Sequence, residues 1–144
     1  MTFSTPAGIG PLDHIGVAVT AIADVLPFYR DVLQLPVGQL EELPHMGLRV
    51  VKITIGESRL ELIEPARDDT TIAGFLAKRG PGIHHVCFRV TDIAAAGRRL
   101  SEEGYRPLTD EPQDGADGCR VLFLHPRQTG GVLIELSQPP HKDL

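Results

Sequence analysis

The sequence predicts an α+β fold in which two tandem βαβββ modules form a curved mixed sheet around a metal-binding cleft. Two observations lead to this prediction: the chain repeats one pattern of apolar and polar residues, and histidines and glutamates recur at matching places in the two copies. At 144 residues the chain has the length of a single domain. We expect module one at about 12–65, a linker at 66–82 and module two at about 83–139.

The repeat becomes visible when LDHIGVAVTAIADVLPFYRDVLQLP is placed over IHHVCFRVTDIAAAGRRLSEEGYRP without a gap. His14 then falls on His85, and apolar residues match along both stretches. A second match places SRLELIEP over VLIELSQP, so that Glu61 falls on Glu135. Because the matches keep the same order in both copies, we interpret the chain as two copies of one module.

The first module begins with an apolar segment, Leu12–Val19, that predicts a strand. Apolar residues then recur at helical spacing, which predicts a helix from Ile22 to Leu33 with Thr20 close to its N-terminal cap. The turn-forming GES separates the last two strands of the module. These closing strands are predicted at 37–42, 48–55 and 59–64.

The second module repeats this order, with a strand at Ile83–Val90 and a helix from Ile93 to Leu100. Thr91 lies near the expected cap of this helix. Its closing strands are predicted at 107–109, 120–124 and 132–137. Between the modules, the linker contains a short predicted helix near Thr71–Lys78.

Four polar residues lie in otherwise apolar strands. In module one, His14 stands near the start of the first strand and Glu61 lies on the last strand. In module two, His85 and Glu135 occupy the same two places. A carboxylate that faces a protein interior costs of the order of several kcal/mol unless it is paired or bound to a cation. Two imidazoles and two carboxylates at equivalent positions therefore predict a divalent metal site, with zinc, nickel, cobalt, manganese or iron as suitable ions.

Each of these residues, taken singly, has a simpler explanation. A strand histidine is usually a satisfied core or edge residue, and a strand glutamate usually faces solvent. Glu64, at the end of its strand, is a competing carboxylate that we expect near solvent. Neighbouring side chains on a strand point to opposite faces, so His85 is expected to face the metal and His84 the other way. Cys87 is interpreted as a small buried hydrophobe.

The composition limits the partners and the compartment. With 42% hydrophobic and 23% charged residues the chain is typical of a globular protein, and a net charge of -5 argues against a nucleic-acid partner. The two cysteines form no CxxC pattern, which favours a reducing compartment. The first residues do not resemble a signal peptide, and no segment approaches the roughly 20 apolar residues of a membrane span. We expect a cytoplasmic protein without a membrane partner.

Several longer motifs carry a family resemblance. They are LDHIGVAV, FYRDVLQL, ELIEP, IAGFLAKRGPGIHHVCFRVTDI and FLHPRQTGGVLIELSQ. With them the chain resembles the vicinal oxygen chelate superfamily, which includes the glyoxalase and bleomycin resistance proteins. Within it the chain resembles the methylmalonyl-CoA epimerase family over nearly all of 12–139. DHIGVAV is widely shared in the superfamily, whereas FLHPRQTGGVLIEL is more particular to the epimerases.

The resemblance implies a metal-dependent epimerase that interconverts the C2 epimers of methylmalonyl-CoA by 1,1-proton transfer through a metal-stabilised enolate. It implies His14, Glu61, His85 and Glu135 as metal ligands and cobalt, manganese, nickel or zinc as the metal. An acyl-CoA substrate and a homodimer follow from the same resemblance. Glu61 is within the family pattern, because members carry either Gln or Glu at that position.

One departure from the family concerns the catalytic base. Some members place a glutamate where this chain has Val50, and valine cannot transfer a proton. Glu135 is therefore assigned as one base and Glu61 as the second catalytic carboxylate. His45 on the preceding loop and a metal-bound water are the alternatives for the second role.

Three further residues are candidates for substrate binding. His125 and Arg127 stand where the family usually has His-Pro-Lys, so Arg127 is expected to meet the substrate carboxylate or a CoA phosphate. Arg49 is a further candidate for the CoA phosphates, with a solvated surface arginine as the alternative.

Two other functions stay open from the sequence. A glyoxalase I-like lyase acting on a glutathione hemithioacetal needs similar metal-assisted proton transfer, so the four ligands do not separate it from an epimerase. A non-catalytic small-molecule-binding protein of the antibiotic-resistance type usually lacks a full ligand set. The four residues therefore count against that reading.

Overall fold

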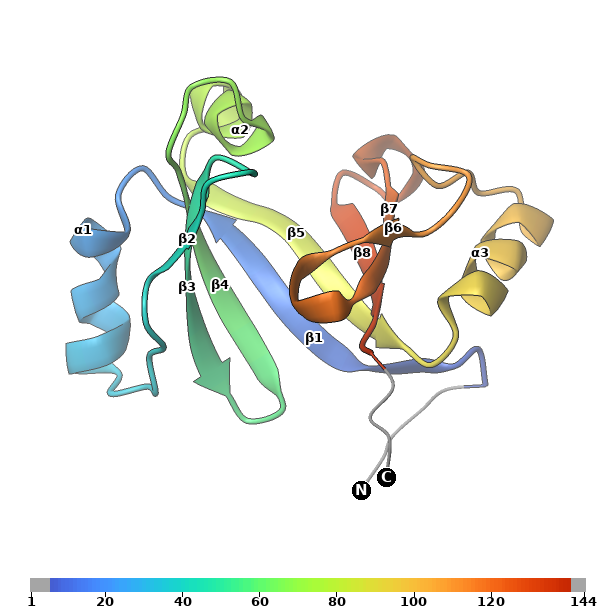
Figure 1. Ribbon diagram of the computed structural model, residues 1–144, viewed down its shortest axis with the longest axis horizontal. Helices are drawn as coiled ribbons and strands as arrows, with labels where there is room; N and C mark the ends of the chain where they lie inside the picture. Colours follow the sequence, from blue (N-terminus) through green and yellow to red (C-terminus); the bar gives the residue numbers. More distant parts are fainter. Residues whose placement is uncertain (1–5, 141–144) are drawn as a thin grey trace. The chain divides into compact units, whose positions relative to one another are not determined.

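The computed structural model describes residues 6–140, and two βαβββ modules follow one another along it, joined by a linking helix (Figure 1). The α+β class and the tandem modules predicted from the repeat are therefore confirmed. The first module and the linking helix comprise β1 Ile9–Ala18, α1 Ile22–Pro27, η1 Phe28–Val32, β2 Glu41–Leu43, β3 Leu48–Ile55, β4 Ser58–Pro65 and α2 Thr71–Arg79. The second comprises β5 Gly82–Val90, α3 Ile93–Glu102, β6 Gln113–Asp114, η2 Ala116–Gly118, β7 Arg120–Leu124, η3 Pro126–Gln128 and β8 Leu133–Gln138.

The chain divides into two compact units. His14–His84 form one, called here the N-terminal unit, and among the described residues 6–13 and 85–140 form the C-terminal unit. Strand β1 contributes its first half to the C-terminal unit and its second half to the N-terminal unit. The strand order is β2-β3-β4-β1 in the N-terminal unit and β1-β5-β8-β7-β6 in the C-terminal unit.

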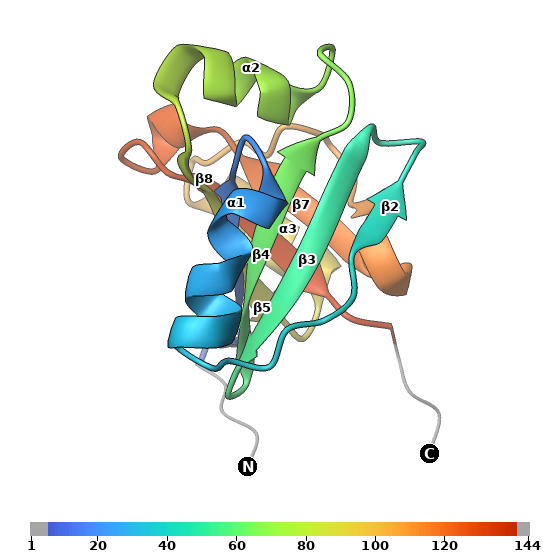
Figure 2. The ribbon, with the colours of Figure 1, turned by 90° about the vertical axis from the view of Figure 1, so that its left-hand side faces the viewer.

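One buried cluster of the N-terminal unit lies between its sheet and α1, and a second includes Ile72 of α2. Strand β1 runs parallel to β4, and β3 runs antiparallel to β4, so residues in register on the three strands share a face. Val19, Val51 and Leu62 lie on the face that packs against Ile22 and the rest of α1. Figure 2 shows α1 lying along this face of β3 and β4. The opposite face of the same sheet carries His14 and Glu61.

The C-terminal unit repeats this arrangement with α3. Strand β5 runs parallel to β8 and β7 runs antiparallel to it. Val90, Leu122 and Leu136 form a buried cluster with Ile93 and Ala96 of α3. Burying such branched apolar side chains contributes roughly 1.5–3 kcal/mol each and holds the helix on the sheet. The face away from α3 again carries the polar residues predicted from the sequence.

The helices of the two modules begin at Ile22 and Ile93, as predicted, and their cap residues follow directly after Thr20 and Thr91. The cap position of α1 is Ala21, with no side-chain cap, and that of α3 is Asp92, whose carboxylate accepts from the Ala95 N–H. Thr20 and Thr91 lie outside the helices. Asp92 is a strong cap because its side-chain oxygen reaches a backbone N–H that has no partner within the helix.

Two of the expected strands are shorter or displaced. The segment predicted at 37–42 forms a strand only at Glu41–Leu43, and Val37 contributes one isolated bridge to Ile53. The segment predicted at 107–109 forms no strand, and β6 lies instead at Gln113–Asp114. Proline occurs at both ends of 107–112, and because it lacks a backbone N–H it interrupts strand pairing.

The helix predicted to reach Leu33 is α-helical only to Pro27 and continues as the π-helical turn η1.

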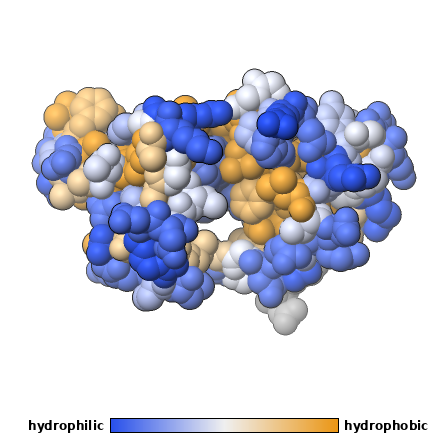
Figure 3. Space-filling model, turned by 90° about the horizontal axis from the view of Figure 1, so that it is seen from above, coloured by the Kyte–Doolittle hydropathy of each residue, from blue (hydrophilic) through white to orange (hydrophobic). Residues whose placement is uncertain are grey.

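The surface carries both polar and apolar residues. Figure 3 shows hydrophilic and hydrophobic residues interspersed on the face that it presents. The exposed apolar side chains include Val32, Ile83 and Leu108, which lie far apart in the sequence. Within residues 6–140, no helix has the length and apolar character needed to cross a membrane.

Candidate functional site

The N-terminal unit brings one of the predicted His–Glu pairs together. His14 on β1 stands opposite Arg59 on β4, so Glu61, two residues further along β4, lies on the same face of the sheet. The distance from His14 Nδ1 to Glu61 Oε2 is 3.4 Å. Both side chains are mostly buried, with 9% and 13% of their surface exposed. The two residues therefore form a pair within one unit.

The C-terminal unit contains the second pair in the same register. His85 on β5 stands opposite Leu133 on β8, and Glu135 lies two residues further along on the same face. The distance from His85 Nε2 to Glu135 Oε1 is again 3.4 Å, and both side chains are mostly buried. The sequence repeat is thus reproduced in the strand pairing and in the distance between the paired side chains.

The spacing within each pair fits two ligands of one cation. A zinc-sized ion has bonds of about 2.1 Å to imidazole nitrogen and carboxylate oxygen, so two ligands of a tetrahedral site are separated by about 3.4 Å. Direct hydrogen bonds between nitrogen and oxygen are usually shorter, at roughly 2.9 Å. The donor set and the spacing of each pair are therefore compatible with a divalent metal.

The N-terminal pair has a cationic neighbour. Arg59 donates from Nη2 to Glu61 Oε2 over 3.1 Å, the same oxygen that lies near His14. Lys52 on β3 stands opposite Glu61 in the antiparallel pairing and therefore points to the same face. The sequence did not single out Arg59, and its signal was its place two residues before Glu61 on the same strand.

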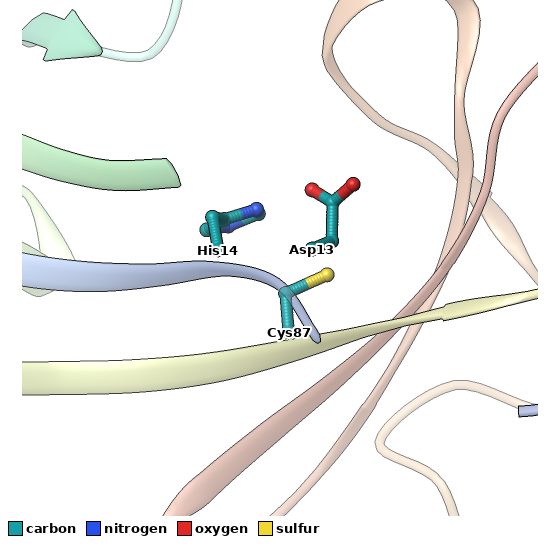
Figure 4. Close-up of side chains that lie close together, drawn as sticks. All are labelled: Asp13, His14 and Cys87. Atoms are coloured by element: carbon teal, nitrogen blue, oxygen red, sulfur yellow. The ribbon is translucent and has the colours of Figure 1, made fainter. Parts of the chain in front are cut away.

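A further polar contact of the C-terminal unit joins β1 and β5. Asp13 Oδ1 accepts from Arg89 Nε over 3.1 Å and from Arg89 Nη2 over 2.9 Å. The Cys87 thiol is fully buried, as predicted, and lies within 4.8 Å of an Asp13 carboxylate oxygen. Figure 4 shows the side chains of Asp13 and Cys87, with His14 as the next residue along β1. Asp13 was missed from the sequence because its partner lies 76 residues away.

The two neighbouring histidines of β5 make different contacts, as their alternation on the strand predicts. The His84 ring meets the Phe75 ring of α2 edge to face, with the centroids 5.2 Å apart at 81°. His85 instead lies near Glu135. Only His85 is thus placed beside a second candidate ligand.

The altered family motif contributes one core residue and one exposed histidine. Val50 is buried in a cluster with Ala18, Ile63 and Ile72, so it belongs to the packed core. His45 lies exposed in the turn between β2 and β3.

Glu64, expected near solvent, is instead largely buried and has two partners. Its Oε1 accepts from the Ile22 N–H over 2.7 Å, and its Oε2 accepts from Arg49 Nη1 over 2.7 Å. Glu64 lies three residues after Glu61 and thus on the other face of the sheet. It is therefore a residue of β4 that holds the start of α1, not a second carboxylate of the site.

The predicted substrate-binding residues have structural partners of their own. Arg49 also donates to Glu42, and its hydrogen bond to Glu64 raises the pKa of the guanidinium above its usual value. His125 Nδ1 accepts from the Arg127 N–H and caps η3. The side chain of Arg127 is exposed.

Comparison with known proteins relates the whole described fold to one family. A family model of the Glyoxalase/Bleomycin resistance protein/Dioxygenase superfamily matches residues 13–123. Mitochondrial methylmalonyl-CoA epimerase of Mus musculus is 41% identical over 148 residues, covering 95% of this chain and 83% of that protein. Ethylmalonyl-CoA/methylmalonyl-CoA epimerase of Cereibacter sphaeroides is 43% identical over 132 residues, covering 90% of this chain and 98% of that protein.

Solved structures give the same relationship. Methylmalonyl-CoA epimerase of Mycobacterium tuberculosis matches with a TM-score of 0.87 at 33% identity, covering 96% of this chain and 94% of that chain. A variant of the Streptomyces coelicolor methylmalonyl-CoA epimerase in complex with 2-nitronate-propionyl-CoA matches with a TM-score of 0.83 at 35% identity. The match covers 93% of this chain and 97% of that chain. The chain therefore belongs to the glyoxalase/bleomycin resistance protein/dioxygenase superfamily and, within it, to the methylmalonyl-CoA epimerases.

Proposed function

We propose that this chain is an epimerase that interconverts the two epimers at C2 of methylmalonyl-CoA. The observation that carries the proposal is the pair of equivalent His–Glu contacts, each with a 3.4 Å separation, in a chain of the methylmalonyl-CoA epimerase family. An acyl-CoA substrate is supported by the related structures bound to acyl-CoA compounds.

The reaction requires stabilisation of negative charge. The hydrogen at C2 lies between a thioester and a carboxylate, and its removal leaves an enolate that carries two negative charges. Preorganised positive charge in a site shielded from water is an effective way to stabilise such a species. When bound, a divalent cation supplies Lewis-acid stabilisation of the thioester oxygen.

The four residues of the two pairs are the proposed ligands of that cation: His14, Glu61, His85 and Glu135. Their imidazole and carboxylate donors suit cobalt, manganese, nickel or zinc, and we infer cobalt as the first ion to test. Within each unit the register of parallel strands holds one histidine and one glutamate on the same face. The backbone thus preorganises each pair without help from a flexible loop.

Proton transfer is assigned to the two glutamates. Glu135 removes or returns the proton on one face of C2, and Glu61 takes the matching role on the other. A two-residue mechanism explains how the hydrogen can leave one face and return on the opposite one. Val50 takes no part, because it is an aliphatic side chain packed in the core.

The remaining proposed roles concern substrate anions and assembly. Arg127 is proposed to bind an anionic group of the acyl-CoA, since its side chain is exposed on η3. His125 holds the η3 turn that carries Arg127. Arg49 is a secondary candidate, because a phosphate must compete with Glu42 and Glu64 for its guanidinium. We further propose a single-domain protein in which module one spans about 12–65 and module two about 83–139, a homodimer and a cytoplasmic location.

Isotope exchange tests the function directly. One epimer of methylmalonyl-CoA is incubated in D2O with the metal-loaded chain, and NMR follows racemisation and the appearance of deuterium at C2. We expect both with the unaltered chain and a loss of both in His85→Ala. His84→Ala is the matched control, because it removes the neighbouring imidazole, which contacts Phe75.

A chain that binds metal but exchanges no C2 hydrogen would contradict the epimerase proposal. The same preparation would then be assayed with a glutathione hemithioacetal, which distinguishes a lyase from a protein that only binds its ligand.

A further inference from the structure

The two His–Glu pairs are equivalent, but the residues beside their glutamates are not. In the N-terminal unit, Glu61 has Arg59 two residues before it on β4 and Lys52 opposite it on β3. In the C-terminal unit the matching neighbours of Glu135 are Leu133 on β8 and Phe123 on β7. Both units use the same register, so the comparison is position by position. Positive charge thus lies beside one of the two glutamates and apolar surface beside the other.

The two cations beside Glu61 are held differently. Arg59 donates to Glu61 Oε2 over 3.1 Å, and only 13% of the Glu61 side chain is exposed. This contact orients the carboxylate and engages the guanidinium. Lys52 Nζ lies 3.5 Å from Glu41 Oε2, and 42% of the Glu41 side chain is exposed. An ion pair of that length with a partly exposed partner contributes little, so another anion can replace Glu41.

Lys52 is also within reach of a ligand held at Glu61. Residues directly opposite on antiparallel strands have their Cβ atoms about 4.5–5.5 Å apart and point to the same face. The Lys52 side chain is 25% exposed, so its ammonium is partly accessible and only partly desolvated. Its charge is held beside Glu61 by the strand pairing of β3 and β4 and not by a loop.

We propose that Lys52 binds the free carboxylate of the acyl-CoA substrate, which replaces Glu41 as its ion-pair partner. The inference rests on the proposed function, in which Glu61 binds the metal next to the reacting carbon. That carbon carries the substrate carboxylate directly, so the carboxylate and the reacting centre must lie close together. Lys52 then selects acyl-CoA compounds with a carboxylate at C2 and leaves Arg127 for the CoA phosphates.

The test compares two ligands that differ by that carboxylate alone. Methylmalonyl-CoA and propionyl-CoA are titrated into the full-length, cobalt-loaded chain by calorimetry. In Lys52→Met we expect the affinity for methylmalonyl-CoA to fall about 10- to 100-fold, the usual range for one charge-assisted hydrogen bond. The affinity for propionyl-CoA should change by less than about threefold. Lys52→Arg, which keeps the charge, should restore most of the preference.

Glu41→Gln tests the exchange itself. Removing the competing carboxylate should tighten methylmalonyl-CoA binding about two- to fivefold, as expected for loss of a partly exposed ion pair, and leave propionyl-CoA binding unchanged. Arg99→Met is the charge-matched control, because Arg99 is exposed on α3 and the variant changes the net charge by the same amount as Lys52→Met. It should alter neither affinity.

Two results would overturn the inference. One is a Lys52→Met variant that keeps its methylmalonyl-CoA affinity, and the other is an equal loss of affinity for both CoA esters. Cobalt affinity and thermal unfolding of the variant, both expected to match the unaltered chain, separate a folding defect from a binding defect. If the unaltered chain itself neither prefers methylmalonyl-CoA nor exchanges its C2 hydrogen, the proposed function fails. If the unaltered chain exchanges the C2 hydrogen but Lys52→Met binds methylmalonyl-CoA normally, only the role of Lys52 fails.

Discussion

Glu64 and Gln138 occupy the same position of the repeat, and each holds the first N–H of the helix in its own unit. Glu64 Oε1 lies 2.7 Å from the backbone nitrogen of Ile22, and Gln138 Oε1 lies 2.8 Å from that of Ile93. The last strand of each module thus fixes the start of the module's helix. The N-terminal N–H groups of a helix have no partner within the helix, so this contact satisfies one of them. It replaces a local cap in α1, where Ala21 provides none, and adds to the Asp92 cap in α3.

Removal of this contact should destabilise the fold. Glu64→Ala leaves the Ile22 N–H without its acceptor, and we expect the free energy of unfolding to fall by about 1 kcal/mol. Glu64→Gln is the matched control, because it installs the residue that the C-terminal unit uses at the same position. It should retain most of the stability in urea unfolding. Equal losses in the two variants would indicate that the ion pair with Arg49, and not the helix contact, is the important one.

Arg59 should act on metal affinity through Glu61. Arg59→Leu installs the residue of the C-terminal unit and removes the 3.1 Å hydrogen bond to the Glu61 carboxylate. Loss of a group that orients a ligand typically weakens metal binding about 10- to 100-fold, and we expect a change near the lower figure. Competition with a chromophoric chelator measures the dissociation constant. Arg59→Lys should recover part of the affinity, and an unchanged constant in Arg59→Leu would rule out this role.

Metal binding should also stabilise the fold. A ligand present at 100 times its dissociation constant stabilises a native state by about 2.7 kcal/mol. The midpoint of thermal unfolding should therefore rise when cobalt is added to chelator-treated protein, and the rise should be small in His85→Ala or Glu135→Gln. His84→Ala should keep the full rise. A rise of equal size in His85→Ala would place the bound cobalt elsewhere.

Val50 should tolerate neither a smaller nor a charged side chain. It is 6% exposed in a cluster with Ile63 and Ile72, so Val50→Ala should lower the free energy of unfolding by roughly 1–3 kcal/mol. Val50→Glu brings a carboxylate into the same apolar cluster and should cost more. It should not increase the exchange rate, although some family members carry glutamate there. A stable Val50→Glu chain with faster exchange would show that this position still faces the substrate.

The sequence was sufficient for features that repeat along the chain. Strands β3 and β7 have the predicted bounds, and β4, β5 and β8 differ by one or two residues. Their apolar residues follow the spacing of a sheet that packs against one helix. The four candidate ligands were also proposed from the sequence, because the duplication places a histidine on the first strand and a glutamate on the last strand of both copies.

The contacts around those ligands could not be found in this way. The helix starts at Ile22 and Ile93 were predicted, but not the contacts of Glu64 and Gln138, which reach these helices over 42 and 45 residues. The contact of Asp13 with Arg89 spans 76 residues, and no local pattern marks it. Side-chain hydrogen bonds of this kind depend on which strands pair and in which register.

The sequence by itself therefore determined the α+β class, the doubled module and the identity of the two His–Glu pairs. Only the tertiary structure decided which side chain reaches each glutamate from a neighbouring strand: Lys52 at Glu61, and Phe123 at Glu135. The physical reason is that periodicity and repetition are properties of the chain. The surroundings of a side chain are instead set by the register of strands far apart in sequence, since a shift of one residue turns every side chain to the other face.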